Sequence, residues 1–241
     1  MSVVSGASRP SQSLRLREIF WAYWWTKFLS SVIGLSAFFV VYFWVEKHTE
    51  FAVTMMPMTT FDRAIGFHPW SLALYATLWI YIMIPSSLMV LKRELTFYYL
   101  GVVVLAVIGL SIFMLWPTET PAPNIDWARY PGISFLKRID GSSNACPSLH
   151  AAFATFTALW NLSILRRLGD RGLLRILSTI WCVGILYSTL ATKQHVLVDL
   201  LGGVALGLVV ALIHLRMWHN RNFCVPDPRM SPALLTQQYP E

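Results

Sequence analysis

Apolar residues gather in six long stretches that shorter polar segments separate. Each stretch approaches the ~20 residues that an α-helix needs to cross the hydrocarbon core of a bilayer. Pro85 lies inside the second stretch, where a kinked helix is tolerated because neighbouring helices satisfy the freed backbone groups. The pattern predicts an all-α fold, a polytopic membrane bundle of six transmembrane helices. The predicted spans cover residues 19–45, 71–91, 95–116, 148–165, 176–192 and 196–215.

The polar ends of the chain predict three parts. Residues 1–18 form an expected cytoplasmic tail, residues 19–218 the six-span membrane domain, and residues 219–241 a second cytoplasmic tail. The first apolar stretch is longer than the apolar core of a secretory signal peptide and lacks a small-residue cleavage pattern. We therefore expect it to stay in the membrane as the first span.

Composition and charge support this assignment. Apolar and aromatic residues make up 56% of the chain and charged residues 13%, whereas a soluble domain has about 25% charged residues. The net charge of +7 is interpreted as topology, because Lys and Arg collect in cytoplasmic loops. With the amino terminus inside, thirteen of the nineteen Lys and Arg residues fall in inner segments. We expect a multi-pass protein of a plasma or inner membrane, both termini cytoplasmic, the 117–147 loop outside, and no nucleic-acid partner.

Three ionisable residues fall at the expected outer ends of spans. His150 begins the fourth, and His195 and Asp199 begin the sixth. Ionisable residues in membrane helices are costly and point to function. His195 and Asp199 are four residues apart, so they share one face of a helix. A carboxylate there can fix the imidazole tautomer and leave the other ring nitrogen as a nucleophile.

The helix starts on this face predict an anion site. Pro147 and Ser148 precede His150, and proline favours the first helical position. The free N–H groups of two helix N-termini would converge on a phosphate oxygen, and Ser148 can add a hydroxyl donor. Two other interpretations stay open: polar residues that hold helices together, and a metal site with two histidines and a carboxylate. We expect no metal and no cofactor, because no further acidic or histidine cluster accompanies them.

The cysteines do not point to catalysis or to a disulfide. The predicted topology puts Cys146 outside, Cys182 in the membrane and Cys224 in the cytoplasm. A cysteine-phosphatase loop needs an arginine six residues after the cysteine, and Ala152 occupies that position.

Two motifs resemble the type 2 phosphatidic acid phosphatase superfamily. Residues 144–150 (Asn-Ala-Cys-Pro-Ser-Leu-His) resemble its proline–serine–histidine motif, and residues 188–199 resemble its S-R-x5-H-x3-D motif. The resemblance implies a membrane lipid phosphatase or lipid phosphotransferase with its site on the extracytoplasmic face. It implies that His195 becomes phosphohistidine, Asp199 orients it and His150 protonates the leaving oxygen. Ser148 matches a phosphate-contacting residue.

The chain departs from the superfamily in its cations. The motif arginine is Thr189 here, and the K-x6-R-P motif is missing from the loop after the third span. The available substitutes are Lys193, Arg129, Lys137 and Arg138, with Lys193 best placed. Thr189 and the Trp-Pro-Thr start of the loop at 116–118 resemble the inositol phosphorylceramide synthase-like branch, which transfers phosphoryl head groups between lipids.

Two function classes follow. The first is an enzyme acting on a lipid phosphate or phospholipid. The alternative is a non-catalytic membrane carrier or assembly subunit that keeps the fold, which the missing cations favour. The intact set of His150, His195 and Asp199 favours the enzyme. The pattern leaves the lipid and the oligomeric state open.

Overall fold

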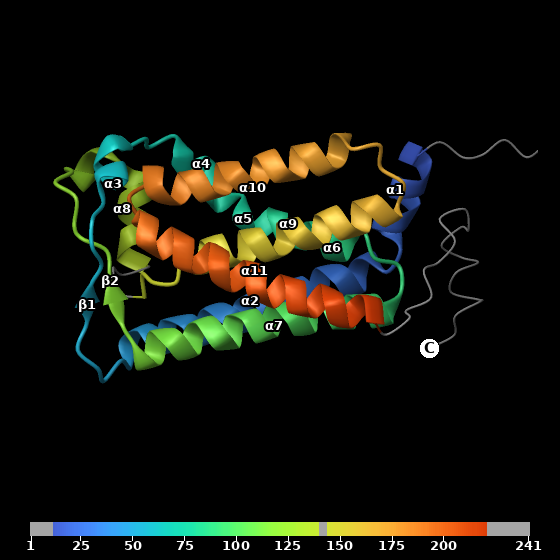
Figure 1. Ribbon diagram of the computed structural model, residues 1–241, viewed down its shortest axis with the longest axis horizontal. Coiled ribbons are helices and arrows are strands. Elements are labelled where there is room, and N and C mark those ends of the chain that lie inside the picture. Colours follow the sequence, from blue (N-terminus) through green and yellow to red (C-terminus); the bar gives the residue numbers. More distant parts are fainter. Residues whose placement is uncertain (1–11, 140–143, 221–241) are drawn as a thin grey trace, which may run out of the picture.

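The computed structural model describes residues 12–139 and 144–220 and confirms a mostly helical chain. The long helices run side by side along the long axis (Figure 1). Most of both predicted tails, together with Cys224, lies outside the described residues. The helices are α1 (Gln12–Trp21), α2 (Trp24–Lys47), α3 (Thr60–Ala64), α4 (Ser71–Ala76), α5 (Leu78–Tyr81), α6 (Met83–Ser87), α7 (Lys92–Leu115), α8 (Pro131–Ile139), α9 (Leu149–Arg167), α10 (Leu173–Ala191) and α11 (Leu197–Asn220), with a 3-10 turn η1 (Trp127–Arg129) and strands β1 (Thr54–Met55) and β2 (Thr118–Glu119).

Within the described residues, four helices are long and apolar enough to cross a membrane: α2, α7, α10 and α11. These helices fit an integral membrane protein. Helix α9 lies between α10 and α11 (Figure 1) and buries polar residues such as Thr157 and Asn161. The second predicted span is one apolar helical segment, Ser71–Ser87, that turns at Thr77 and Ile82 divide into α4, α5 and α6.

The first long helix begins later than predicted, at Trp24 instead of residue 19. The helix breaks at Tyr23, whose φ of 53° is left-handed, and α2 begins at Trp24. Lys27 in α2 is buried, and its ammonium donates to the carbonyls of Ile19 at 2.8 Å and Ser87 at 3.1 Å. The separate helix α1 is therefore tied to the end of α6.

One short strand pair, which the sequence did not predict, accompanies the helices. Strands β1 and β2 pair in parallel, Thr54 with Thr118 and Met55 with Glu119. Each strand has two residues, which is too short to produce a period-two pattern in the sequence. The pair joins the loop after α2 to the loop after α7.

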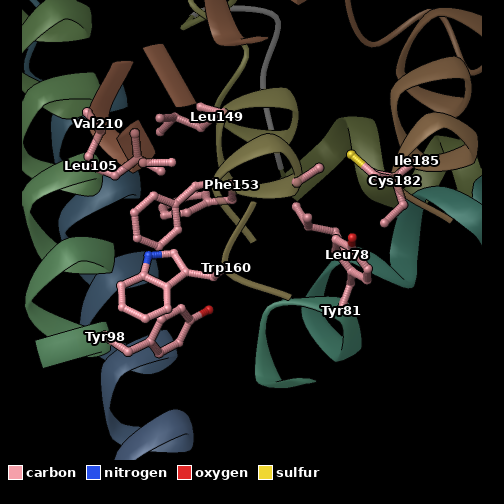
Figure 2. Close-up of a cluster of buried hydrophobic side chains, with 14 of the residues drawn as sticks. Leu78, Tyr81, Tyr98, Leu105, Leu149, Phe153, Trp160, Cys182, Ile185 and Val210 are labelled. Carbon is pink, nitrogen blue, oxygen red and sulfur yellow. The ribbon is translucent and has the colours of Figure 1, made fainter. Parts of the chain in front are cut away.

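Helix α9 supplies the centre of the apolar core. Figure 2 shows Leu149, Phe153 and Trp160 of this helix among side chains from α5, α7, α10 and α11. Helix α11 approaches α9 closely, because a Cβ added at Gly203 would meet the carbonyl oxygen of Ser148. This contact brings the first turns of α9 and α11 together and so positions the residues that the sequence singled out.

Candidate active site

Three ionisable side chains lie close together at one end of the bundle, where α9 and α11 begin. His150 is the second residue of α9, His195 lies in the turn before α11, and Asp199 lies in the first turn of α11. The two imidazoles are close enough to interact electrostatically. Strands β1 and β2 and helices α3 and α8 lie at the same end, which we call the loop end (Figure 1).

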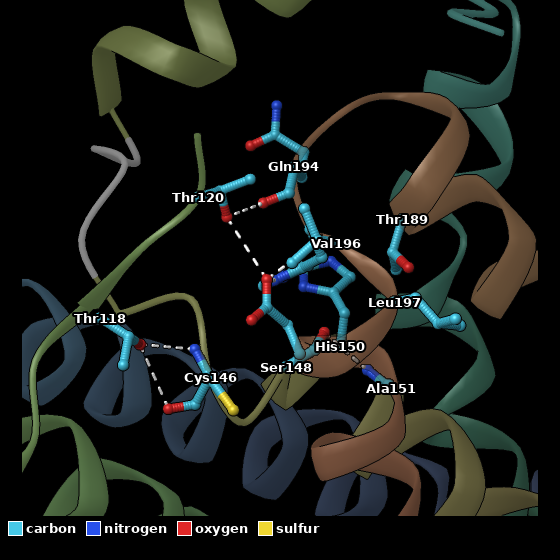
Figure 3. A network of polar contacts seen from close by, with 12 residues as sticks. Thr118, Thr120, Cys146, Ser148, His150, Ala151, Thr189, Gln194, Val196 and Leu197 are labelled. Atoms are coloured by element: carbon cyan, nitrogen blue, oxygen red, sulfur yellow. Dashed lines mark hydrogen bonds and ion pairs between the residues drawn. The ribbon is translucent and has the colours of Figure 1, made fainter. Parts of the chain in front are cut away.

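The carboxylate of Asp199 is fully buried and faces His195. Its Oδ2 lies 3.7 Å from His195 Nδ1, longer than a hydrogen bond but within ion-pair distance. The same oxygen accepts from the backbone N–H of Val196 at 3.0 Å. The Thr120 hydroxyl, which donates to the Gln194 carbonyl at 3.1 Å, lies 3.5 Å from it (Figure 3). Asp199 thus caps its own helix and holds negative charge beside Nδ1. A carboxylate there favours the tautomer with the proton on Nδ1, which would place the free lone pair of His195 on Nε2.

Ser148 links the two helices. Its side-chain oxygen accepts from the backbone N–H of Ala151 at 3.3 Å and caps α9. Its own backbone N–H donates to the Asp199 carbonyl at 2.9 Å. The residue is fully buried. The predicted phosphate-binding hydroxyl therefore also serves as a helix cap, with its proton still able to be donated.

The His150 ring is held by aromatic side chains from the second predicted span. Tyr75 of α4 stacks on it with ring centroids 3.8 Å apart, and the Tyr75 hydroxyl lies 3.1 Å from His150 Nδ1. Trp79 of α5 meets the ring edge-on, with centroids 5.5 Å apart. The hydroxyl engages one ring nitrogen, so Nε2 is the nitrogen available to a substrate. Tyr75 and Trp79 were not predicted as site residues, since aromatic residues are frequent in membrane segments and near span ends.

Lys193 engages a neighbouring loop. Its ammonium donates to the backbone carbonyls of Asp62 at 2.9 Å and Ile65 at 2.6 Å. The Asp62 carboxylate accepts from the backbone N–H of Leu197 at 2.7 Å, in the first turn of α11. Burial lowers the pKa of Lys193, and the Asp62 charge opposes that shift. The α3 segment thus holds the turn that carries His195 in place. Its carbonyls accept from the ammonium that was predicted to bind phosphate, and its Asp62 carboxylate accepts from one N–H group at the α11 N-terminus.

The other predicted cations are placed on the loop that follows α7. Arg129 is exposed in η1 and pairs with Asp126 at 3.1 Å. Arg138 lies in α8, and its side chain is outside the described residues. Thr189, at the position of the motif arginine, is buried and donates its hydroxyl to the Leu186 carbonyl at 2.8 Å. Arg129 is therefore paired within its own loop. Thr189 instead holds the turn that carries His195, because its backbone carbonyl accepts from the N–H groups of Gln194 and His195, each at 3.2 Å.

Thr118 and Cys146 form the wall of the site beside Asp199. The backbone N–H of Cys146 donates to the Thr118 hydroxyl at 2.7 Å, which fixes the segment before α9 against β2 (Figure 3). Burial, followed by the charge of Asp199, raises the pKa of the Cys146 thiol to about 11. The thiol stays protonated near neutral pH, so it is a poor nucleophile.

Several buried polar atoms at this end have no hydrogen-bond partner within the described part of the chain. They include His150 Nε2, His195 Nδ1 and Asp199 Oδ1. Buried polar groups are normally paired, and those that are not call for an explanation such as catalysis. No group of three or more His, Cys, Asp or Glu side chains in residues 12–139 and 144–220 is arranged to hold a metal ion. The arrangement is suited to nucleophilic and acid–base chemistry by two histidines and one carboxylate.

Comparison with known proteins agrees with the two motifs. The sequence profile of the family described as PAP2 superfamily matches residues 95–223, which is more than half of the chain. No curated protein and no solved structure matches the chain. The matched segment begins in α7 and contains α9, α10 and α11, and so includes both histidines and Asp199.

Proposed function

The chain belongs to the PAP2 superfamily, and on that premise we propose that it is a membrane enzyme that cleaves or transfers a lipid phosphate through a phosphohistidine at His195. Membership suggests phosphatase or phosphotransferase activity. The observation that carries the specific proposal is the meeting of His150 with the His195–Asp199 pair. A carrier has no need to bring a nucleophile, an orienting carboxylate and an acid to one point.

The first half-reaction forms the phosphoenzyme. His195 Nε2 attacks phosphorus while the bond from phosphorus to the leaving oxygen breaks. Asp199 stabilises the positive charge that develops on the His195 imidazole. His150 begins as the imidazolium, passes its Nε2 proton to the leaving oxygen and becomes neutral. Tyr75 supports this assignment, because its hydroxyl at Nδ1 directs Nε2 of His150 toward the substrate.

The second half-reaction releases the phosphoryl group. An acceptor hydroxyl, from water or a second lipid alcohol, gives its proton to His150 and its oxygen attacks phosphorus. The bond from phosphorus to His195 Nε2 breaks, and both histidines return to their starting state. Water gives hydrolysis and an alcohol gives transfer.

The cations of the site favour transfer or diester substrates. Thr189 replaces an arginine, and the Lys193 ammonium is engaged by two carbonyls. A phosphodiester carries less negative charge than a phosphomonoester and needs less fixed positive charge. This supports placing the chain in the inositol phosphorylceramide synthase-like branch of the superfamily.

We propose that six segments cross the membrane: the four apolar helices α2, α7, α10 and α11, together with α9 and the α4–α6 segment. Both termini are cytoplasmic and the loop end is extracytoplasmic. The charge bias supports it: Arg166, Arg167, Arg171 and Arg175 cluster around the turn between α9 and α10, far from the loop end (Figure 1).

A partition experiment tests the function. Purified protein is given a labelled donor lipid with increasing concentrations of polyol or ceramide-like acceptor, beside the His195→Ala variant. We expect label in a new lipid that rises with acceptor and is absent with the variant. Label found only as inorganic phosphate at every acceptor concentration would reject transfer to those acceptors. Absence of turnover across a panel of lipid phosphates and diesters would favour the non-catalytic carrier. The engaged ammonium of Lys193 is the observation that favours this alternative.

A further inference from the structure

An apolar cavity of about 570 Å³ lies between α2, α7, α9 and the α5–α6 segment. This volume falls within the range of ligand pockets, ~300–1,000 Å³. Helix α2 contributes one face at Ser30, Gly34, Ala37 and Val41, spaced as one helix face. Several lining residues, including Ile33 and Val103, are exposed, so the cavity opens toward the surroundings of the bundle as a groove.

Small residues on α2 leave this space open. Small residues at such spacing usually let two membrane helices approach closely. Here the opposite happens, because no heavy atom lies within 4 Å of a Cβ added at Gly34. The small face of α2 therefore borders a groove instead of a helix contact.

One end of the groove reaches the candidate active site. Trp79 lines the groove and also meets the His150 ring edge-on at 5.5 Å. Phe153, one turn after His150 on α9, lines it as well and packs against Phe38 of α2 with centroids 5.5 Å apart. An occupant of the groove would therefore end beside His150.

The other end shows what kind of occupant fits. The hydroxyls of Ser31 and Tyr99 lie 2.9 Å apart, and Tyr99 donates to the Lys27 carbonyl at 3.2 Å. These polar groups hydrogen-bond to each other and to the backbone, so the lining is suited to a hydrocarbon ligand. From Ser30 to Val41 the groove follows α2 for about 16 Å, at 1.5 Å per residue. That length is about half of the ~30 Å hydrocarbon core, the depth of a single leaflet.

We propose that this groove holds one acyl chain of the lipid substrate while its phosphate lies between His150 and His195. The proposal rests on the proposed function, since it assumes that the loop end binds the phosphate. Trp79 would lie where the acyl chain of the lipid joins its headgroup. The length of the groove beyond Trp79 would then select the length of the acyl chain.

Filling the groove tests the proposal. Gly34→Phe places a ring in open space, and Val40→Phe adds the same ring to the same helix at a residue that is 71% exposed and does not line the groove. With Gly34→Phe we expect kcat/KM for a long-chain lipid phosphate to fall by on the order of tenfold or more, because a displaced chain misplaces the reacting phosphate. Turnover of a short-chain, water-soluble phosphate ester should stay at the wild-type level, and Val40→Phe should change neither. Equal rates of Gly34→Phe and wild type on the long-chain lipid, or equal loss on both substrates, would overturn the proposal.

A binding readout separates this inference from the catalytic one. A phospholipid with a photoactivatable group on its acyl chain is cross-linked to the His195→Ala protein, in which His195 chemistry cannot interfere. We expect labelled peptides from α2 and α7 around Gly34 and Val103, and loss of that label when Gly34→Phe is added. Label spread evenly over outward-facing positions such as Val40 and Ile180 would mean ordinary surrounding lipid and would overturn the groove. Groove-specific label in a wild-type protein that turns over no lipid phosphate would instead reject the catalytic function and keep the groove.

Discussion

The orientation of the His150 ring depends on a neighbour from another helix. Tyr75 stacks on the ring and places its hydroxyl 3.1 Å from Nδ1, while Nε2 is buried without a partner within the described residues. In the proposed mechanism, Nε2 would face the leaving oxygen while the Tyr75 hydroxyl holds Nδ1. Tyr75 would then be a positioning residue that acts through His150.

Tyr75→Phe keeps the stacked ring and removes the hydroxyl. A neutral hydrogen bond contributes about 1 kcal/mol, so we expect about a fivefold loss of kcat with donors that have a poor alkoxide leaving group. Donors with a good leaving group need little proton donation and should react at nearly the wild-type rate. Parallel measurements of kcat on the two donors check this, and the same loss on both would mean that Tyr75 does not act through proton transfer.

A variant of Lys193 tests whether this residue binds phosphate or holds the α3 segment against the turn before α11. Its ammonium donates to two carbonyls of the α3 segment, and hydrogen bonds from charged groups contribute about 2 kcal/mol. We expect Lys193→Met to lower the thermal unfolding midpoint and to reduce kcat, with KM little changed. A raised KM that grows with the negative charge of the donor, at wild-type stability, would instead make Lys193 a phosphate ligand.

The sequence identified His150, His195 and Asp199 because ionisable groups stand out in apolar segments. It could not place Tyr75 beside His150 or Thr120 beside Asp199, since both contacts join residues more than 70 positions apart. It also could not tell that the charge of Lys193 is engaged, because side-chain direction depends on the fold of the α3 segment.

At the scale of elements, the site depends on how closely α9 and α11 approach. A Cβ at Gly203 would meet the Ser148 carbonyl oxygen, and one at Gly207 would meet the Ala152 carbonyl oxygen. Backbone atoms cannot yield as a flexible side chain would. Any side chain at these positions must move α11, and with it Asp199, away from His150.

Gly203→Ala is therefore expected to lower stability by about 1–3 kcal/mol and to reduce turnover. Gly34→Ala is the matched control: its Cβ meets nothing within 4 Å, and alanine is the better helix former by up to about 1 kcal/mol. Thermal unfolding in detergent and turnover of a soluble donor measure both variants. Similar shifts for the two would contradict the close α9–α11 contact.

Hydrophobic periodicity predicted the long helices well and the irregular elements poorly. The stretch at 95–116 became α7 with ends within a few residues. The stretch at 71–91 was also apolar, yet it forms three short helices, and the break at Tyr23 left no mark in the apolar pattern. Apolarity reports burial in lipid or core, whereas breaks depend on backbone conformations that tertiary contacts select.

For the whole molecule, the proposed topology places the loop end outside the cell and the opposite end in the cytoplasm. Native cysteines are poor reporters, because Cys146 is buried and its pKa is raised to about 11 by burial, followed by the charge of Asp199. Exposed positions serve better. Asn124 lies on the loop after α7, and Arg171 lies on the turn between α9 and α10.

In a cysteine-free background, Asn124→Cys should react with an impermeant maleimide in intact cells. Arg171→Cys should react only after the membrane is opened. The reverse pattern would place the site on the cytoplasmic face, and labelling of both positions in intact cells would contradict an odd number of crossings between them.

The central claim is that His195 carries the phosphoryl group, and trapping the phosphoenzyme tests it most directly. The protein is mixed with a donor labelled in its phosphate, quenched in alkali where phosphohistidine survives, and mapped by mass spectrometry. We predict label on His195, absent from His195→Ala and lost when an acceptor alcohol is added before the quench. Label on another residue, or undiminished turnover by His195→Ala, would contradict the account.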